Sequence, residues 1–63
     1  MKWTDTREIA IELLEKFPEV DPQYIHFPQL YQWVCELDNF DDDPKNCGEK
    51  ILESIQQHWI DEQ

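Results

Sequence analysis

Carboxylates are the side chains of this chain that are numerous and close enough together to do chemistry. Five of the eight residues from 36 to 43 are acids: Glu36, Asp38, Asp41, Asp42 and Asp43. Leu37 and Phe40 lie among them, whereas a disordered acidic tail has no apolar residues that need burial. We therefore interpret residues 36–44 as a junction between two helices, here called the acidic junction. We expect Leu37 and Phe40 to anchor it to a core while its charge faces solvent.

The acidic junction has a structural and a functional interpretation. As a solvated turn, it would use Asp43 to cap the helix that follows. Capping does not account for five carboxylates, and crowding of like charges costs stability, so a basic partner surface is the favoured explanation. We predict that this partner contacts the acids of the junction together with two acids near residue 63: Glu36, Asp38, Asp41, Asp42, Asp43, Asp61 and Glu62.

A second group of acids recurs at steps of three and four residues: Asp5, Glu8, Glu12 and Glu15. At about 100° per residue, these side chains share the side of a helix that faces away from its apolar residues. Carboxylate oxygens bind hard cations, and Glu8 and Glu12 lie one helical turn apart. We predict weak, exposed binding of ferrous or ferric iron here, with Asp41 and Asp42 as alternative ligands and no tightly bound cofactor. The alternative is an ordinary solvated helix face.

The remaining reactive side chains do not suggest catalysis. We assign His26 and His58 to packing or surface roles. Cys35 and Cys47 belong to no CxxC motif and lack zinc-ligand spacing. Nearby acids raise the pKa of a thiol, which disfavours a nucleophile. No serine–histidine–acid pattern or phosphate-binding loop is visible, so we predict that the protein is not an enzyme.

The charge balance restricts the class of partner. Fifteen acids against five bases give a net charge of −10. This charge disfavours nucleic acid and anionic membrane surfaces, and it favours a basic protein, cations or both. The first residues have no apolar run, and no later stretch could span a bilayer. With two unlinked cysteines, these features predict a cytoplasmic protein, which we expect to be a monomer.

Hydrophobic spacing predicts three helices, at residues 6–17, 28–38 and 47–60. Their expected buried residues are Ile9, Ala10, Leu13, Leu14 and Phe17, then Leu30, Trp33, Val34 and Leu37, then Ile51, Leu52, Ile55 and Trp59. Asp5 with Glu8, and Asn46 with Glu49, resemble capping boxes. Residues 24–27 read as a short extended segment. We expect one domain, residues 1–63, that is mainly α: a three-helix, helix-turn-helix or modified winged-helix-like fold with at most very short extended segments.

Several of these residues together resemble the IscX family, also called YfhJ. The matching pieces are Lys2-Trp3-Thr4-Asp5, Arg7-Glu8-Ile9, Asp21-Pro22, Phe27, Gln32-Trp33-Val34-Cys35, Leu37, Phe40-Asp41-Asp42-Asp43-Pro44, Glu49-Lys50-Ile51-Leu52-Glu53, Trp59 and Asp61-Glu62. They cover nearly the whole chain. Pro28, Asn39 and Cys47 depart from the family pattern.

The resemblance implies a role in bacterial iron–sulfur cluster assembly. The IscX family has a modified winged helix without DNA binding and is associated with the cysteine desulfurase IscS. By resemblance, the chain would dock on a basic patch that overlaps the sites of frataxin and ferredoxin and would regulate sulfur delivery. Weak iron binding through surface carboxylates is also implied. The alternative function is an iron carrier or iron sensor for cluster assembly.

Overall fold

The computed structural model describes residues 1–63 and is built from helices alone. The α-helices are α1 (Thr6–Lys16), α2 (Phe27–Cys35) and α3 (Glu49–Glu62). Two single-turn 3₁₀ helices, η1 (Pro22–Tyr24) and η2 (Pro44–Asn46), lie in the connections. No residue is in a strand, so the mainly helical prediction is confirmed, while the winged-helix comparison stays a prediction. None of the helices combines the length and apolar character needed to cross a membrane.

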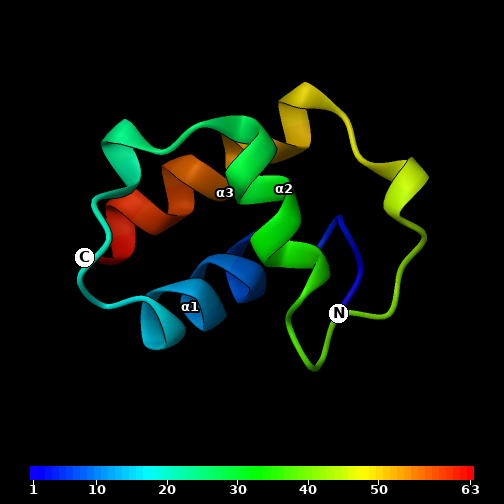
Figure 1. Cartoon of the computed structure of the whole chain (residues 1–63), viewed down its shortest axis with the longest axis horizontal. Coiled ribbons are helices and arrows are strands. Elements are labelled where there is room, and N and C mark those ends of the chain that lie inside the picture. The colour runs from blue at the N-terminus through cyan, green and yellow to red at the C-terminus, as the bar shows by residue number, and fades with distance from the viewer.

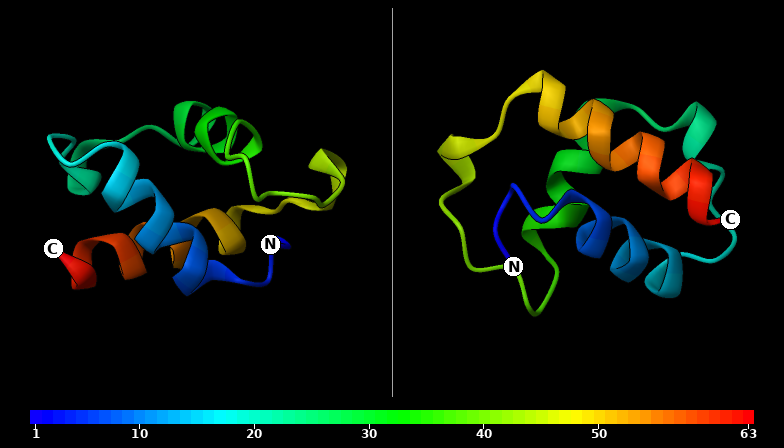
Figure 2. Two further views of the ribbon diagram at one scale, coloured as in Figure 1. Left: turned by 90° about the horizontal axis from the view of Figure 1, so that it is seen from below. Right: turned by 180° about the vertical axis from the view of Figure 1, so that it is seen from behind.

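Helices α1 and α3 cross in close contact, and α2 lies over the pair (Figures 1 and 2). The two ends of the molecule differ. At one end the 3₁₀ helix η1 and the carboxyl terminus lie together, where Gln56 Nε2 donates to the Pro22 carbonyl at 2.8 Å. At the other end the long connection from α2 to α3 surrounds the amino terminus (Figure 1).

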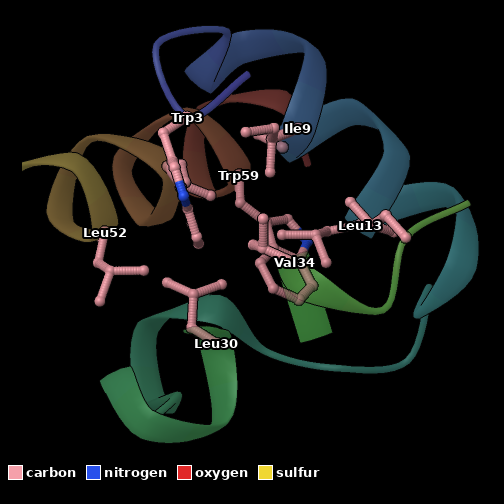
Figure 3. Close-up of a cluster of buried hydrophobic side chains, with 10 residues drawn as sticks. Trp3, Ile9, Leu13, Leu30, Val34, Leu52 and Trp59 are labelled. Atoms are coloured by element: carbon pink, nitrogen blue, oxygen red, sulfur yellow. The ribbon is translucent and has the colours of Figure 1, made fainter. Parts of the chain in front are cut away.

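The core contains one residue cluster to which every α-helix contributes. Its ten buried members are Trp3, Ile9, Ala10, Leu13, Leu30, Val34, Leu37, Leu52, Ile55 and Trp59. Trp3 and Trp59 are its largest side chains, 1% and 0% exposed (Figure 3). Large rings bury roughly 150–250 Å² each, which explains how so short a chain closes a core. The predicted apolar faces are therefore largely confirmed.

Trp33 is half-buried and extends the core toward the surface. Its ring stacks on Phe17, with centroids 4.2 Å apart and planes 17° apart, and it also contacts Trp59. Helix α1 ends at Lys16, one residue before the predicted end, and Phe17 is its C-cap residue. The stack therefore joins the end of α1 to the last turn of α2.

Helix α2 is shorter than predicted. It ends at Cys35, although residues 28–38 were expected to be helical, and it begins at Phe27. Glu36 and Asp38 stand where the helix dipole already concentrates negative charge, so acids there disfavour continuation. The chain instead makes two tight turns, with Leu37 N–H donating to the Val34 carbonyl and Phe40 N–H to the Leu37 carbonyl, both at 3.1 Å. Leu37 remains buried, as predicted.

Both predicted capping boxes are wrong. Asp5 precedes α1, but its side chain makes no capping bond, because Oδ2 accepts the Lys2 N–H at 2.9 Å. Helix α3 begins at Glu49 after Gly48, not at Cys47. Asn46 belongs to η2, and its side chain bonds to Asp42 instead of to α3.

The predicted extended segment at residues 24–27 is only partly correct. Tyr24 ends η1, and Phe27 begins α2. Ile25 and His26 between them have extended backbone angles but pair with no other segment. Asp21 caps η1 by accepting the Gln23 N–H at 3.0 Å.

Candidate functional site

The acidic junction is held against the first residues of the chain. Lys2 Nζ donates to the Asp41 carbonyl at 3.1 Å, and the Asp41 N–H donates to the Met1 carbonyl at 3.0 Å. The Met1 ammonium donates to the Asn39 carbonyl at 2.6 Å. The blue amino-terminal segment accordingly lies inside the loop formed by residues 36–48 in Figure 1. The junction is thus a loop closed by long-range contacts and not a free acidic turn.

Asp42 is the most heavily bonded carboxylate of the junction. Its Oδ2 accepts the Trp3 backbone N–H at 3.0 Å. Its Oδ1 accepts from Asn46 Nδ2 at 3.1 Å and from the Asp43 N–H at 2.7 Å. These bonds favour the charged form and hold the pKa of Asp42 below its usual range, with the Trp3 N–H making the largest contribution. Asp42 therefore stabilises the loop through hydrogen bonds within the chain.

Asp41 and Asp43 are exposed but also have partners within the chain. Asp41 Oδ1 lies 3.2 Å from the Met1 ammonium and 3.5 Å from Lys2 Nζ. These two cations, the ammonium first, lower the pKa of Asp41. Asp43 Oδ1 accepts the Lys45 N–H at 2.9 Å and caps η2. The structural interpretation of Asp43 as a cap is therefore confirmed, although the helix that it caps is η2 and not α3.

The side chain of Trp3 supports this loop through one hydrogen bond and two aromatic contacts. Its indole Nε1 donates to the Asp43 carbonyl at 2.9 Å. Its ring stacks on Tyr31 with centroids 5.6 Å apart and meets the edge of Phe40 at 4.6 Å. Phe40 is thus anchored as predicted. Hydrophobic spacing in the sequence gives no sign of these contacts, since Trp3 and Asp43 are 40 residues apart.

The other predicted partner-binding acids fall into two separate places. Glu36 and Asp38 are exposed at the junction, where Glu36 accepts only a long hydrogen bond, 3.4 Å, from Gln32. Asp61 and Glu62 lie at the opposite end of the molecule, near the carboxyl terminus (Figure 1). Glu62 there forms an ion pair with Arg7 at 3.3 Å. The structure therefore does not bring all seven predicted partner-binding acids onto one surface.

The acids of α1 do lie next to the junction. Asn39 Nδ2 donates to Glu12 Oε1 at 2.7 Å. A shallow hollow of about 390 Å³ is lined by Met1, Glu8, Ile11, Glu12, Glu15 and Asn39. Asn39 thereby connects the junction to α1, and we call a group of acids from these two connected parts of the molecule the acidic face. It comprises Glu8, Glu12, Glu15, Glu36, Asp38 and Asp41.

The geometry provides no preformed metal centre. No three His, Cys, Asp or Glu side chains gather in a way that could hold a metal ion. Asp5 accepts the Lys2 N–H and lines a neighbouring hollow with Glu8, apart from Glu12 and Glu15. Any ion on α1 would therefore have at most two side-chain ligands, with water completing its shell. Iron binding at Asp5, Glu8, Glu12 and Glu15, or at Asp41 and Asp42, stays a prediction.

The cysteines and histidines lie outside the acidic face. His26 is exposed, and His58 is half-buried on α3. Cys35 and Cys47 are unlinked and half-buried, and both pack against the core. Their pKa values are raised, as predicted, but burial is the main cause in both and the neighbouring Glu36 adds only to Cys35.

Comparison with known proteins identifies the family. Residues 1–63 match the model of a family described as iron-sulphur cluster assembly. An uncharacterised protein of Pseudomonas aeruginosa is 58% identical over 62 residues, which cover 98% of this chain and 94% of that relative. The match extends over both acid groups and all three helices. The chain therefore belongs to the iron–sulphur cluster assembly family that its sequence resembles, the IscX family.

Proposed function

We propose that this protein is a non-enzymatic adaptor that regulates iron–sulfur cluster assembly by docking on the cysteine desulfurase IscS. The supporting observation is the acidic face, where Glu8, Glu15 and Asp38 are exposed and have no ion-pair partner. A basic surface on the partner is its natural complement. Because frataxin and ferredoxin would use the same basic surface, the adaptor competes with them. It acts as a cytoplasmic monomer.

The docking acids are the ones that have no partner within the chain. Asp42 and Asp43 accept bonds that hold the loop, so they shape the surface instead of meeting the partner. Glu36 and Asp38 stand beside them without strong internal contacts. Exposed charges of this kind raise association rates and discriminate between partners, and salt screens their effect.

A pair of charge-reversed variants with equal net charge tests this proposal. The test variant is Glu36→Lys with Asp38→Lys on the acidic face. The matched control is Glu19→Lys with Glu53→Lys, two exposed acids outside it. Each pair adds four positive charge units, so general attraction between the whole molecules is equal. Reversal of Asp41, Asp42 and Asp43 would be less informative, because it would also break bonds that hold the loop.

We expect calorimetry with the desulfurase at low salt to show at least about tenfold weaker binding for the acidic-face variant than for its control. The difference should shrink at high salt, because screening weakens exposed pairs. Equal loss of affinity in the two variants would show that docking depends on net charge and not on this face. Unchanged affinity in the acidic-face variant would exclude the face as the docking surface.

The second candidate function is an iron carrier or sensor. It is favoured by the shallow hollow that Glu8, Glu12 and Glu15 line. Titration with ferrous iron should then broaden the amide resonances of these residues first, and Glu8→Gln with Glu12→Gln should abolish the selective broadening. Glu49→Gln with Glu53→Gln is a control for general loss of charge. Broadening that spreads over all exposed acids and does not saturate would contradict a site.

A further inference from the structure

Two cysteines flank the acidic junction in the sequence. Cys35 is the last residue of α2, and Cys47 lies in the short link between η2 and α3. Both are half-buried, and both pack against the hydrophobic core. All five acids of the junction lie between them.

Tyr31 connects the two cysteines in space. It stands one helical turn before Cys35, and its hydroxyl donates to the Pro44 carbonyl at 3.1 Å, three residues before Cys47. Burial is the main cause that raises the pKa of the Tyr31 phenol, and the charges of Cys35 and Cys47 raise it further. Cys35 acts on Cys47 in the same way. The bond between Tyr31 and the Pro44 carbonyl therefore holds the end of α2 next to the segment that leads into Cys47.

The segment that carries Cys47 is a short link that is not part of any helix. Cys47 and Gly48 have extended backbone angles and lie outside every helix. No atom lies within 4 Å of the position that a Cβ at Gly48 would take. A disulfide needs Cα atoms no more than about 7 Å apart, and because the link lies outside every helix, Cys47 can approach the end of α2 without the unwinding of a helix.

We propose that Cys35 and Cys47 form a reversible intramolecular disulfide by exchange with a low-molecular-weight disulfide such as oxidised glutathione. The thiolate of one cysteine attacks a glutathione sulfur, forms a mixed disulfide and releases one glutathione thiolate. The thiolate of the other attacks the protein sulfur of that mixed disulfide and releases the second. Two electrons pass from the cysteine sulfurs to glutathione, and the two thiol protons neutralise the released thiolates.

This disulfide would close a covalent ring around the acidic junction. The ring contains residues 35–47, which include Glu36, Asp38, Asp41, Asp42 and Asp43. Its effect on docking rests on the function proposed above, because oxidation would fix the shape of part of the acidic face. The formation of the bond does not depend on that function and is tested separately.

Mass spectrometry of the whole chain decides whether the bond forms. The reduced protein is incubated with excess oxidised glutathione at pH 8, quenched with acid and measured intact. We expect the main product to have lost two hydrogens, and a proteolytic digest to contain one peptide pair joined through Cys35 and Cys47. Cys35→Ser and Cys47→Ser should each take up one glutathione, since neither can complete the second exchange.

Two results would overturn the proposal. One is a wild-type product that carries two glutathiones, which would show that the thiols react independently. The other is a covalent dimer as the main product at low protein concentration. Unfolding of a serine variant does not affect the test, because the wild-type mass alone distinguishes the ring from both alternatives. A chain that forms the ring but fails to bind the desulfurase in either redox state would overturn the proposed function and not the disulfide.

Discussion

The acidic junction and the acidic side of α1 have similar charge but differ in their contacts within the chain. In the junction, Asp41, Asp42 and Asp43 accept hydrogen bonds or ion pairs from their own chain. On α1, Glu8 and Glu15 are exposed and have no partner. The difference shows that the density of acids along a sequence does not identify the ones that a partner can reach. The densest run is the part that the protein uses for its own architecture.

The two regions also manage like-charge repulsion differently. Asp42 offsets the repulsion of its neighbours with three hydrogen bonds from Trp3, Asp43 and Asn46. The acids of α1 tolerate their repulsion in solvent, where a like-charged pair one turn apart costs only about 0.2–0.5 kcal/mol. Changes at Asp42 should therefore alter stability, and changes at Glu8 or Glu15 should not. The following predictions test this contrast from the largest effect to the smallest.

Trp3→Ala should have the largest effect, because it removes the aromatic support of the junction and part of the core together. Replacing a buried tryptophan by alanine costs about 3–5 kcal/mol. A chain of this length has a free energy of unfolding of roughly 3–9 kcal/mol, so the variant should lose at least about a third of its stability. Urea unfolding followed by far-ultraviolet circular dichroism measures the change. Trp3→Phe is the control, since it keeps an aromatic ring and loses the bond to the Asp43 carbonyl.

Asp42→Ala should be the next most damaging change. It leaves the Trp3 N–H without its acceptor and the Asn46 side chain without its partner. The urea midpoint should fall between those of Trp3→Ala and the wild type. Asp42→Asn retains an acceptor oxygen and should lose less. A midpoint for Asp42→Ala equal to that of the wild type would show that these bonds do not hold the loop.

Acid should weaken the junction through the same carboxylate. Because its folded-state pKa lies below the unfolded value of about 3.9, Asp42 contributes stability that is present above that pH and is lost as the pH falls through the folded-state pKa. The urea midpoint of the wild type should therefore drop steeply below about pH 4. The drop should be shallower for Asp42→Asn, which cannot take up the proton. Parallel pH curves for the two proteins would contradict this assignment.

Glu8→Gln and Glu15→Gln should have the smallest effect on stability. Both side chains are exposed on α1 without a bonded partner, so each change should stay within about ±0.5 kcal/mol. Urea unfolding at neutral pH measures it. A loss comparable to that of Asp42→Ala would mean that the α1 acids also support the fold, and the contrast between the two regions would fail.

The fold was predictable from the sequence where the buried residues are hydrophobic and recur on one face of a helix. Ile9, Leu13 and Ile55 recur at helical spacing and are fully buried. Local signals failed where a distant contact competes for the same atoms. Asp5 and Asn46 are good capping residues, but Lys2 and Asp42 engage their side chains first. The end of α2 was placed three residues too far because apolar spacing continues to Leu37, which is buried from a turn instead of from the helix.

The candidate site was predictable in its residue types and less so in its geometry. The sequence indicated both acid groups and the anchoring role of Phe40. It could not show that Asn39 joins the two groups by bonding to Glu12, since 27 residues separate them. Nor could it show that Trp3 bonds to Asp42 and so affects which aspartates remain free to contact a partner. Both facts depend on tertiary contacts that leave no periodic pattern.

The bond between Trp3 and Asp42 also has a consequence for the order of folding. It joins residues 39 positions apart, so it forms only after most of the chain has been brought together. The helices can form and dock before this closure, and the junction then takes its shape in a late step. Substitutions at Asp42 should therefore accelerate unfolding much more than they slow folding, which stopped-flow measurements in urea would record as a change confined to the unfolding arm of the chevron.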